Sequence, residues 1–417
     1  MKRETGLRGA LARVAQVGPE LLSAASDNDP TNVGTAAVVG AQTGYQLAWV
    51  AVLIAPLLAV VQNLALRVAV AGRGDLQSLA SKRYGRMVAI TLLVSVVVVN
   101  VVTIAADLQA GAAGIGLLAG INARWLVAPV GLGLLGLLLL GKYDEVVAVL
   151  RYLLVGFLAF GAAAVMARPD WPRLLGDSFV PDLSLHRGVL AGTLAMVGTT
   201  LTAYVYMWET IERGVEEPLD TPDGEGWSRA RAGAVAGAVF TAVIFWFMLV
   251  ASAATLGRTH QSVSSAQDAA RALRPLAGSL ASDLFAGGLV VSALVALPVL
   301  MATTAYVVGA ELNWRRGLSE GIRHARGFYA VMAVSIALAV AMALANISVL
   351  GMLVAASIIG GIGTPIGLAV LVLLARDPAV MGERTVPLGL AIAGWAVAVV
   401  VGGLGLLFLA GAALGTF

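Results

Sequence analysis

The sequence predicts an all-α, polytopic membrane protein with about eleven transmembrane helices. Of its 417 residues, 59% are hydrophobic and only 12% are charged, whereas soluble domains carry about 25% charged residues. The mean hydropathy is +0.89, and long apolar stretches recur along the whole chain. A soluble protein of this composition would lack the polar groups that cover a surface. The composition therefore excludes a cytosolic enzyme, a nucleic-acid binder and a disordered chain.

The apolar stretches define the expected helices. A spanning helix needs about 20 mostly apolar residues. The stretch from Gly327 to Ala375 contains no charged residue but is too long for one helix, so we divide it near Asn346. The expected spans are 19–43, 47–70, 88–118, 125–141, 146–166, 190–213, 233–257, 283–308, 328–345, 349–374 and 387–413.

The distribution of basic residues predicts the orientation of these spans. With the N-terminus placed in the cytoplasm, 20 of the 27 Lys and Arg residues fall in inside segments and 7 fall outside. Loops rich in Lys and Arg lie on the cytoplasmic side of membrane proteins. We therefore expect a multi-pass protein of the cell membrane with a cytoplasmic N-terminus and an external C-terminus. Residues 1–17, with four basic residues, are expected to form a cytosolic amphipathic segment or a tail.

The first span carries polar residues in its middle. Asp27, Asn28, Asp29 and Asn32 interrupt an otherwise apolar stretch, and Pro30 disfavours helical backbone at the residue before it. We expect the helix to break there. A broken helix frees carbonyl groups and exposes helix ends inside the membrane, which is how transporters build ion sites. A short loop between two interfacial segments is the alternative, and the uncharged residues 33–66 argue against it.

The sixth span carries a weaker signal of the same kind. Residues 197–204 contain Gly198 and three threonines, Thr199, Thr200 and Thr202, but no proline. Small residues and Thr are also common at helix contacts in membranes. The segment nevertheless occupies in span six the place that the break occupies in span one. Spans one to five (18–166) and six to ten (167–374) then form two repeats, the second inverted, and residues 375–417 form span eleven. Interruptions at matching places in two repeats indicate a binding site between them.

Three further acidic residues lie in or near the spans. Asp107 is the only charge in span three, and a membrane carboxylate is expected to face protein or water rather than lipid. Its alternative role is to bind a polar partner in helix packing. Glu209 and Glu212 lie at the inner end of span six, where they would line a vestibule or simply a solvated helix end.

Other chemistry is not indicated by the sequence. There is no Cys, and the three His residues lie outside the apolar stretches. A disulfide framework, a thiolate metal site and a multi-His metal site are therefore not expected. No phosphate-binding loop or catalytic triad occurs. We expect a protein that is not an enzyme, holds no cofactor and binds no nucleic acid.

The segment from Gly18 to Val50 resembles the first span of Nramp divalent-metal transporters. Their hallmark is Asp-Pro-Gly-Asn, and residues 29–32 here read Asp-Pro-Thr-Asn, with the following Gly-Ala and Gly-Tyr pairs in step. Residues 105–109 (AADLQ) are similar to the family's Asp-Leu in span three. Residues 198–212 (GTTLTAYVYMWETIE) are most similar to the Nramp-related branch that includes magnesium transporters.

This resemblance implies a fold, a substrate and a ligand set. The fold is the LeuT-like 5+5 inverted repeat with broken helices one and six. The substrate is a divalent metal cation, bound by the side chains of Asp29 and Asn32, by a backbone carbonyl near Thr199 and by the side chain of Thr202. The polar residues nearby would line the pathway or support the ligands; these are Asp27, Asn28, Tyr204, Glu209 and Asp107.

The sequence departs from the family at positions that affect selectivity. The family's Met-Pro-His in span six is replaced by Thr202, Ala203 and Tyr204. Oxygen ligands suit Mg²⁺, Ca²⁺ and Mn²⁺, whereas a thioether favours softer metals. Mg²⁺ also retains water when bound, which calls for a roomy site. We expect Mg²⁺ as the first choice of substrate and Mn²⁺ as the second.

Proton coupling is expected to be absent or weak. The family's span-six His is Tyr204 here, and the acidic residue expected three positions after Asp107 is Ala110. Span nine, residues 328–345, carries no charge to continue a proton path. We therefore expect a monomeric importer of divalent cations that works by alternating access in the lipid bilayer. The alternatives are a LeuT-fold transporter of a small organic solute, such as an amino acid or amine, and a non-transporting sensor or membrane chaperone.

Overall fold

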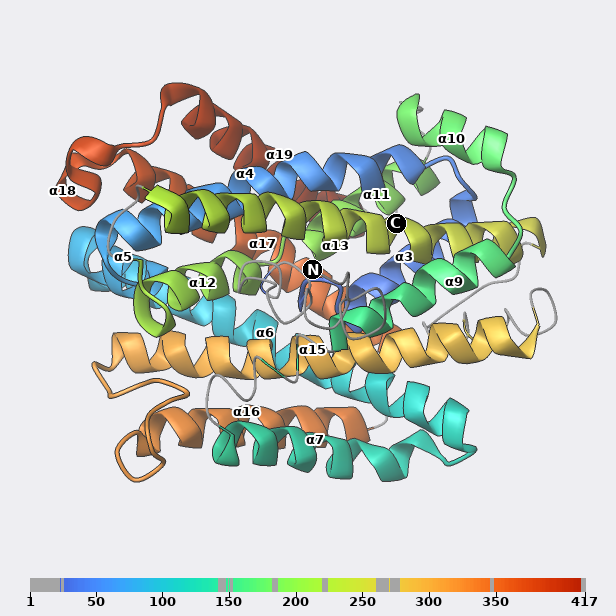
Figure 1. Cartoon of the computed structure of the whole chain (residues 1–417), viewed down its shortest axis with the longest axis horizontal. Coiled ribbons are helices and arrows are strands. Elements are labelled where there is room, and N and C mark those ends of the chain that lie inside the picture. Colours follow the sequence, from blue (N-terminus) through green and yellow to red (C-terminus); the bar gives the residue numbers. More distant parts are fainter. Residues whose placement is uncertain are drawn as a thin grey trace, which may run out of the picture.

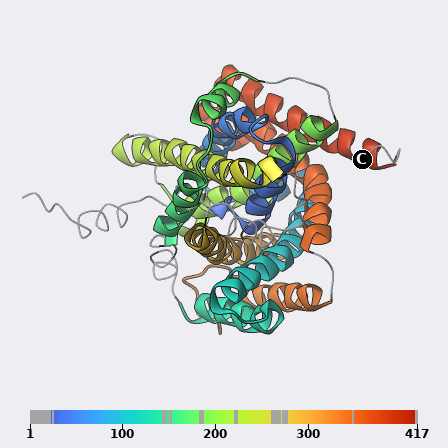
Figure 2. The same cartoon turned by 90° about the vertical axis from the view of Figure 1, so that its right-hand side faces the viewer.

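The helices lie side by side along one axis of the molecule and form a bundle (Figure 1). The computed structural model describes residues 23, 26–141, 148, 150, 153–181, 187–219, 224–259, 270, 278–345 and 349–413. Residues 1–17, for which we expect an amphipathic segment or tail, lie outside the described residues. The end-on view shows α7 and α16 together at one edge of the bundle (Figure 2).

The first half of the chain contains α3 (Pro30–Thr43), α4 (Ala48–Gly72), α5 (Leu76–Tyr84), α6 (Arg86–Ala119), α7 (Ala123–Leu140), the 3₁₀ turn η1 (Leu154–Phe157), α9 (Leu158–Met166) and α10 (Trp171–Phe179). The rest of the chain contains α11 (Arg187–Thr200), α12 (Ala203–Ile211), the π-helical turn η2 (Glu212–Glu216), α13 (Gly224–Thr259), α15 (Ser279–Glu311), α16 (Arg326–Leu344), α17 (Val349–Arg376), α18 (Pro378–Met381), the 3₁₀ turn η3 (Gly382–Arg384) and α19 (Leu388–Ala413).

The described helices agree with most of the expected spans. By length and composition, 8 helices of the described residues can cross a membrane, or 9 if the bent pair Gly363–Arg376 and Pro378–Arg384 counts as one. The other expected spans are described only in part. Span one contributes the 14 residues of α3, and span five contributes the short apolar helix Leu154–Met166. The total of eleven therefore stays a prediction.

Span one is broken where the sequence predicts. Residues 27–29 are not helical, and α3 begins at Pro30. Proline fits the first turn of a helix, where its missing N–H would have no partner. From this break α3 runs toward the end of the bundle that carries α10 (Figure 1).

Span six is broken at Leu201 and Thr202, between α11 and α12. Thr202 has φ −77° and ψ 149°, an extended conformation that ends the helical path. From this break α12 runs toward the opposite end of the bundle, which carries α5 (Figure 1). α3 therefore begins at the break of span one. At the break of span six, α11 ends and α12 begins.

Close packing of backbones holds the broken span one in place. α3 packs against α11, α6 and especially α13. At the contact with α13, a Cβ added to Gly40 would lie 2.6 Å from the backbone oxygen of Leu249. Only glycine allows this approach, in agreement with the small residues found at helix contacts in membranes.

Candidate metal site

The two breaks are joined by hydrogen bonds between their side chains. The hydroxyl of Thr202 donates to Oδ1 of Asp27 over 3.2 Å. The hydroxyl of Tyr204 lies 2.8 Å from the carbonyl oxygen of Ser26 and 3.3 Å from Oδ2 of Asp29. The start of α12 thus contacts both carboxylates of the first break, as the matching interruptions in the sequence predict.

Asp29 is held by the helix that follows it. Its Oδ1 accepts a hydrogen bond of 2.7 Å from the backbone N–H of Asn32, so Asp29 is the N-cap of α3. The N-terminus of a helix carries a partial positive charge, which stabilises a carboxylate there. Asp29 is fully buried. The carboxylate is therefore fixed in position before any ligand arrives.

Asn32 connects the two ends of the first break. Its amide nitrogen donates to the backbone carbonyl of Asp27, which leaves its Oδ1 facing span six. The hydroxyl of Thr200 lies 3.4 Å from that Oδ1 but only 2.6 Å from the carbonyl oxygen of Met196. A hydroxyl has a single hydrogen, and the shorter contact takes it. The amide oxygen of Asn32 is therefore available as a ligand.

The two predicted span-six ligands, Thr199 and Thr202, lie on either side of the break in span six. Thr202 is at the N-cap position of α12 but makes no capping hydrogen bond, although a Thr cap normally stabilises a helix by about 1 kcal/mol. Its hydroxyl contacts Asp27 instead. The hydroxyl of Thr199 donates to Ala195 within α11. Thr199 lies in the last turn of α11, where backbone carbonyls have no helical partner, so its main-chain oxygen suits the predicted role.

Asp107 supports the first break from α6. Its Oδ1 accepts hydrogen bonds from the backbone N–H of Thr31, over 3.1 Å, and from the hydroxyl of Thr31, over 2.9 Å. Its Oδ2 has no hydrogen-bond partner among the described residues. Asp107 therefore fixes Thr31, which lies between Pro30 and Asn32. Both interpretations of Asp107 from the sequence, a pathway residue and a packing residue with a polar partner, remain consistent with this contact.

The remaining predicted residues divide into near and distant ones. Asn28 lies in the break, is fully buried, and its backbone carbonyl accepts a hydrogen bond from the hydroxyl of Ser292 on α15. Glu209 is also fully buried, but it lies seven residues beyond Thr202 on α12, about 10 Å along the helix. Asn28 thus lies in the first break, against α15, whereas Glu209 lies farther along α12.

The site brings together three buried carboxyl groups. Asp27, Asp29 and Asp107 are each 0% exposed. Among the described residues none of them forms an ion pair with Lys or Arg; their hydrogen bonds are with hydroxyl and backbone N–H groups. A buried charge is costly unless an opposite charge compensates it. The arrangement therefore suits a cation.

The donor atoms indicate which cations fit. They are carboxylate, amide, hydroxyl and carbonyl oxygens, the ligands of hard cations. No group of three or more His, Cys, Asp or Glu residues that could hold a metal occurs within the described part of the chain. A metal bound here would therefore use amide and main-chain oxygens besides the carboxylates.

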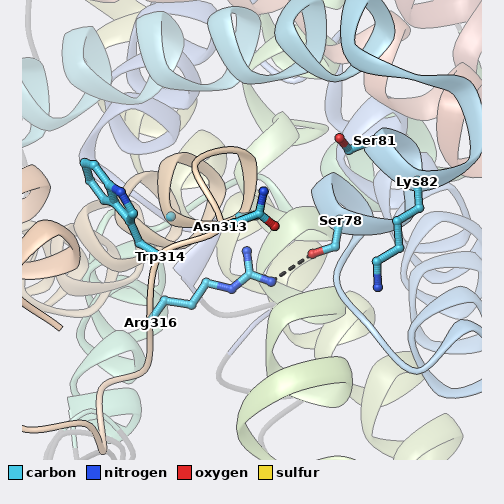
Figure 3. A pocket seen from close by; sticks show the side chains of 8 residues that line it. Ser78, Ser81, Lys82, Asn313, Trp314 and Arg316 are labelled. Atoms are coloured by element: carbon cyan, nitrogen blue, oxygen red, sulfur yellow. Dashed lines mark hydrogen bonds between the residues drawn. The ribbon is translucent and has the colours of Figure 1, made fainter. Parts of the chain in front are cut away.

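A second polar network connects the elements at the α5 end of the bundle. Asp75, the N-cap of α5, accepts a 2.6 Å hydrogen bond from the Arg316 guanidinium, which also donates to the hydroxyl of Ser78 over 2.8 Å (Figure 3). A cavity of about 260 Å³ lies beside this pair. Tyr306 on α15 donates to Glu216 of η2. The Tyr306–Glu216 contact joins the end of span six to α15, and the Arg316 contacts join α5 to the segment after α15.

Sequence reasoning missed several contacts of the site. Thr31, Thr200 and Ser292 each contact a residue of the first break or its support. Thr31 occupies the Gly position of the family's hallmark, which is a signal that could have identified it. Ser292 gave no signal, because only the packing of α15 brings it near Asn28.

The helix arrangement with its two breaks is the LeuT-like fold. The same architecture occurs in the structure of MhsT in complex with L-phenylalanine, with a TM-score of 0.62 and 12% identity over 95% of this chain and 98% of that one. The crystal structure of an Eremococcus coleocola manganese transporter, in complex with an aromatic bis-isothiourea substituted compound, gives a TM-score of 0.72. Its identity to this chain is 18%, and the match covers 98% of this chain and 88% of that one.

Sequence comparison identifies the family. The family model described as natural resistance-associated macrophage protein-like, Nramp, matches residues 20–411. The chain belongs to the Nramp family of transporters and is not an enzyme. The divalent metal cation transporter MntH of Aeromonas hydrophila is 26% identical over 94% of both chains. The MntH protein of Deinococcus radiodurans is 29% identical over 70% of this chain and 68% of its own length.

Proposed function

We propose that this protein imports divalent metal cations across the cell membrane by alternating access, with Mg²⁺ as the preferred ion and Mn²⁺ as the second. The observation that carries the proposal is the buried set of oxygen atoms between the two helix breaks, with Asp29 and Asn32 at its centre. Its carboxyl groups form no ion pair with Lys or Arg within the described residues. The names of the MntH relatives support a divalent cation as substrate.

The ligand set of the proposal comprises the side chains of Asp29, Asn32 and Thr202 and the main-chain carbonyl of Thr199. The preference for Mg²⁺ over Mn²⁺ rests on Thr202, which stands where classical members carry Met. An oxygen ligand in place of a thioether removes the advantage of softer metals. The manganese transporter that shares this fold supports Mn²⁺ as the second ion only by analogy.

Movement of the ion requires the site to open, because its carboxylates are fully buried in this conformation. The two breaks are the expected hinges. We propose that the α5 end faces the cytoplasm, since Lys82 and Arg83 lie there, and that the protein acts as a monomer with repeats at 18–166 and 167–374. The membrane potential would drive import with about 4.6 kcal/mol per 100 mV for a divalent ion.

Uptake into proteoliposomes tests this proposal. Wild-type protein should accumulate Mg²⁺ and Mn²⁺ under an inside-negative potential, and Asp29→Ala should reduce uptake to the level of empty liposomes. Acidification of the lumen should be weak or absent during uptake. Equal behaviour of wild type and Asp29→Ala for every divalent ion would refute the site.

Binding calorimetry separates this function from transport of an amino acid or amine on the same fold. The two carboxylates of the first break disfavour an anionic group on a substrate. Heat of binding with Mg²⁺ or Mn²⁺, and none with amino acids, is the expected result. The reverse pattern would favour the organic solute.

A further inference from the structure

The carboxylate of Asp27 is placed like a ligand rather than like a packing residue. Asp27 is fully buried in the non-helical stretch before Pro30. Its Oδ1 accepts a hydrogen bond from Thr202, whose side chain is itself one of the proposed ligands. The side chain of Asp27 therefore points from span one toward the same atoms that the metal would contact.

The second oxygen of Asp27 has no protein partner among the described residues. Oδ2 is buried and makes no hydrogen bond with any of them. Buried polar atoms are nearly always paired, and a native exception calls for an explanation such as an ion. In Asp27, Thr202 holds Oδ1 in place while Oδ2 is unpaired among the described residues. This arrangement suits the binding of a cation.

The backbone around Asp27 is fixed as well. Its carbonyl accepts a hydrogen bond from the amide nitrogen of Asn32, which orients the amide oxygen of Asn32 as a ligand. At the other end of the site, Tyr204 contacts Asp29. The first residues of α12 thus reach both carboxylates, Asp27 through Thr202 and Asp29 through Tyr204.

From these contacts we infer that Asp27 is a direct metal ligand and that the transported ion binds between the carboxylates of Asp27 and Asp29. This inference rests on the proposed function and adds to it a second carboxylate. Two carboxylates carry a charge that a divalent ion neutralises and a monovalent ion does not. The number of charged ligands is a main determinant of the affinity of oxygen sites for divalent cations. Asp27 therefore favours divalent over monovalent cations.

Variants that separate charge from shape test the inference. Asp27→Asn keeps the size of the side chain and its ability to accept from Thr202, but removes the charge. Asp27→Glu keeps the charge but lengthens the side chain. For a direct ligand, Asp27→Asn should weaken Mn²⁺ binding more than the roughly 10- to 100-fold loss that an outer-shell partner gives, whereas Asp27→Glu should stay within about tenfold of wild type. If Asp27 serves only in packing, Asp27→Glu should weaken Mn²⁺ binding more than Asp27→Asn does.

Isothermal titration of the purified full chain with Mn²⁺ alone gives the readout, repeated with Mg²⁺ in competition. Asp29→Asn is titrated in parallel, and Asp283→Asn, an exposed carboxylate at the start of α15, controls for the loss of one charge. Thermal melting without metal checks that each variant is folded. Binding by Asp283→Asn should equal that of wild type.

The outcomes separate this inference from the proposed function. Loss of binding in both Asp29→Asn and Asp27→Asn supports both. Loss in Asp29→Asn with wild-type affinity in Asp27→Asn overturns the role of Asp27 alone. No Mn²⁺ binding by the wild type overturns the proposed function and this inference with it. If Asp27→Asn does not fold, Asp27→Glu decides: retained binding supports the ligand, and lost binding in a folded protein contradicts it.

Discussion

The ion pair between Asp75 and Arg316 offers a way to perturb the α5 end of the bundle without touching the metal site. The pair is 2.6 Å long, and its side chains are 3% and 17% exposed. The Arg316 guanidinium also donates to Ser78 and to the carbonyl of Tyr306. Arg316→Ala therefore removes contacts that join α5 to the segment after α15, and leaves Asp75 buried without its cation.

The size of the effect follows from burial. Breaking a buried ion pair costs about 3–5 kcal/mol. Because Arg316 is partly exposed, we expect its loss to destabilise the closed conformation of the α5 end, relative to the open one, by about 2–3 kcal/mol. Each 1.4 kcal/mol changes an equilibrium tenfold. The ratio of open to closed molecules should therefore rise by about 30- to 150-fold.

Cysteine labelling measures this ratio, and the chain has no Cys of its own. Ala80 on α5 is fully buried, so a single Ala80→Cys reports opening of this end. Its reaction rate with a maleimide should rise with the open fraction in Arg316→Ala. The matched control is Arg83→Ala, which breaks the pair with Asp377 at the same end; because Arg83 is 46% exposed, this pair is expected to contribute less than the buried one. A rate within twofold of the parent in Arg316→Ala would refute the reasoning.

Three further predictions concern selectivity, packing and pH. Thr202→Met should raise the Mn²⁺ over Mg²⁺ uptake ratio about tenfold in a competition assay, since a thioether favours the softer ion; an unchanged ratio would contradict the role of this side chain. Gly40→Val should lower stability by about 1–3 kcal/mol, seen as a lower melting temperature, because a Cβ there meets the backbone of α13; unchanged melting would contradict the close contact. The Arg83 guanidinium donates a hydrogen bond to Asp377 and lowers the pKa of that carboxyl. The pair therefore stabilises the protein at pH values above the ordinary Asp pKa of about 3.9. This stabilisation is lost as the pH falls through the lowered pKa of Asp377. The melting-temperature difference between wild type and Arg83→Ala should therefore be larger at pH 7 than at pH 2, and a difference independent of pH would argue against the pair.

The break of span one could be predicted because its cause is local. Asp29 is a strong N-cap residue and Pro30 fits the first helical turn, so these two neighbours determine where α3 begins. The break of span six has no proline. Only its position relative to span one indicated it, and the extended backbone at Thr202 confirms the prediction.

The contacts within the site were less predictable, because they depend on how distant helices pack. Asp107 was identified by its charge, but its partner Thr31 lies 76 positions away. Likewise, the pairing of Asp27 with Thr202 joins residues 175 positions apart. A sequence identifies such polar residues by their cost in a membrane, but it does not say which of their atoms remain unpaired.

The short helices outside the spans were also missed. The charge pattern indicates only a cytoplasmic segment between the second and third expected spans, yet this segment forms α5, capped by Asp75. Capping and amphipathic character are local signals that could have revealed it. Its contact with Arg316, 241 positions away from Asp75, could not have been inferred in that way.

Locating a bound Mn²⁺ ion by anomalous scattering, in crystals of the wild-type protein soaked with Mn²⁺, tests most directly whether the facing breaks form the metal site. We expect a peak between the carboxylates of Asp27 and Asp29, about 2.0–2.6 Å from their oxygens and from the amide oxygen of Asn32. A well-occupied peak elsewhere in the bundle, with none between these residues, would contradict the site.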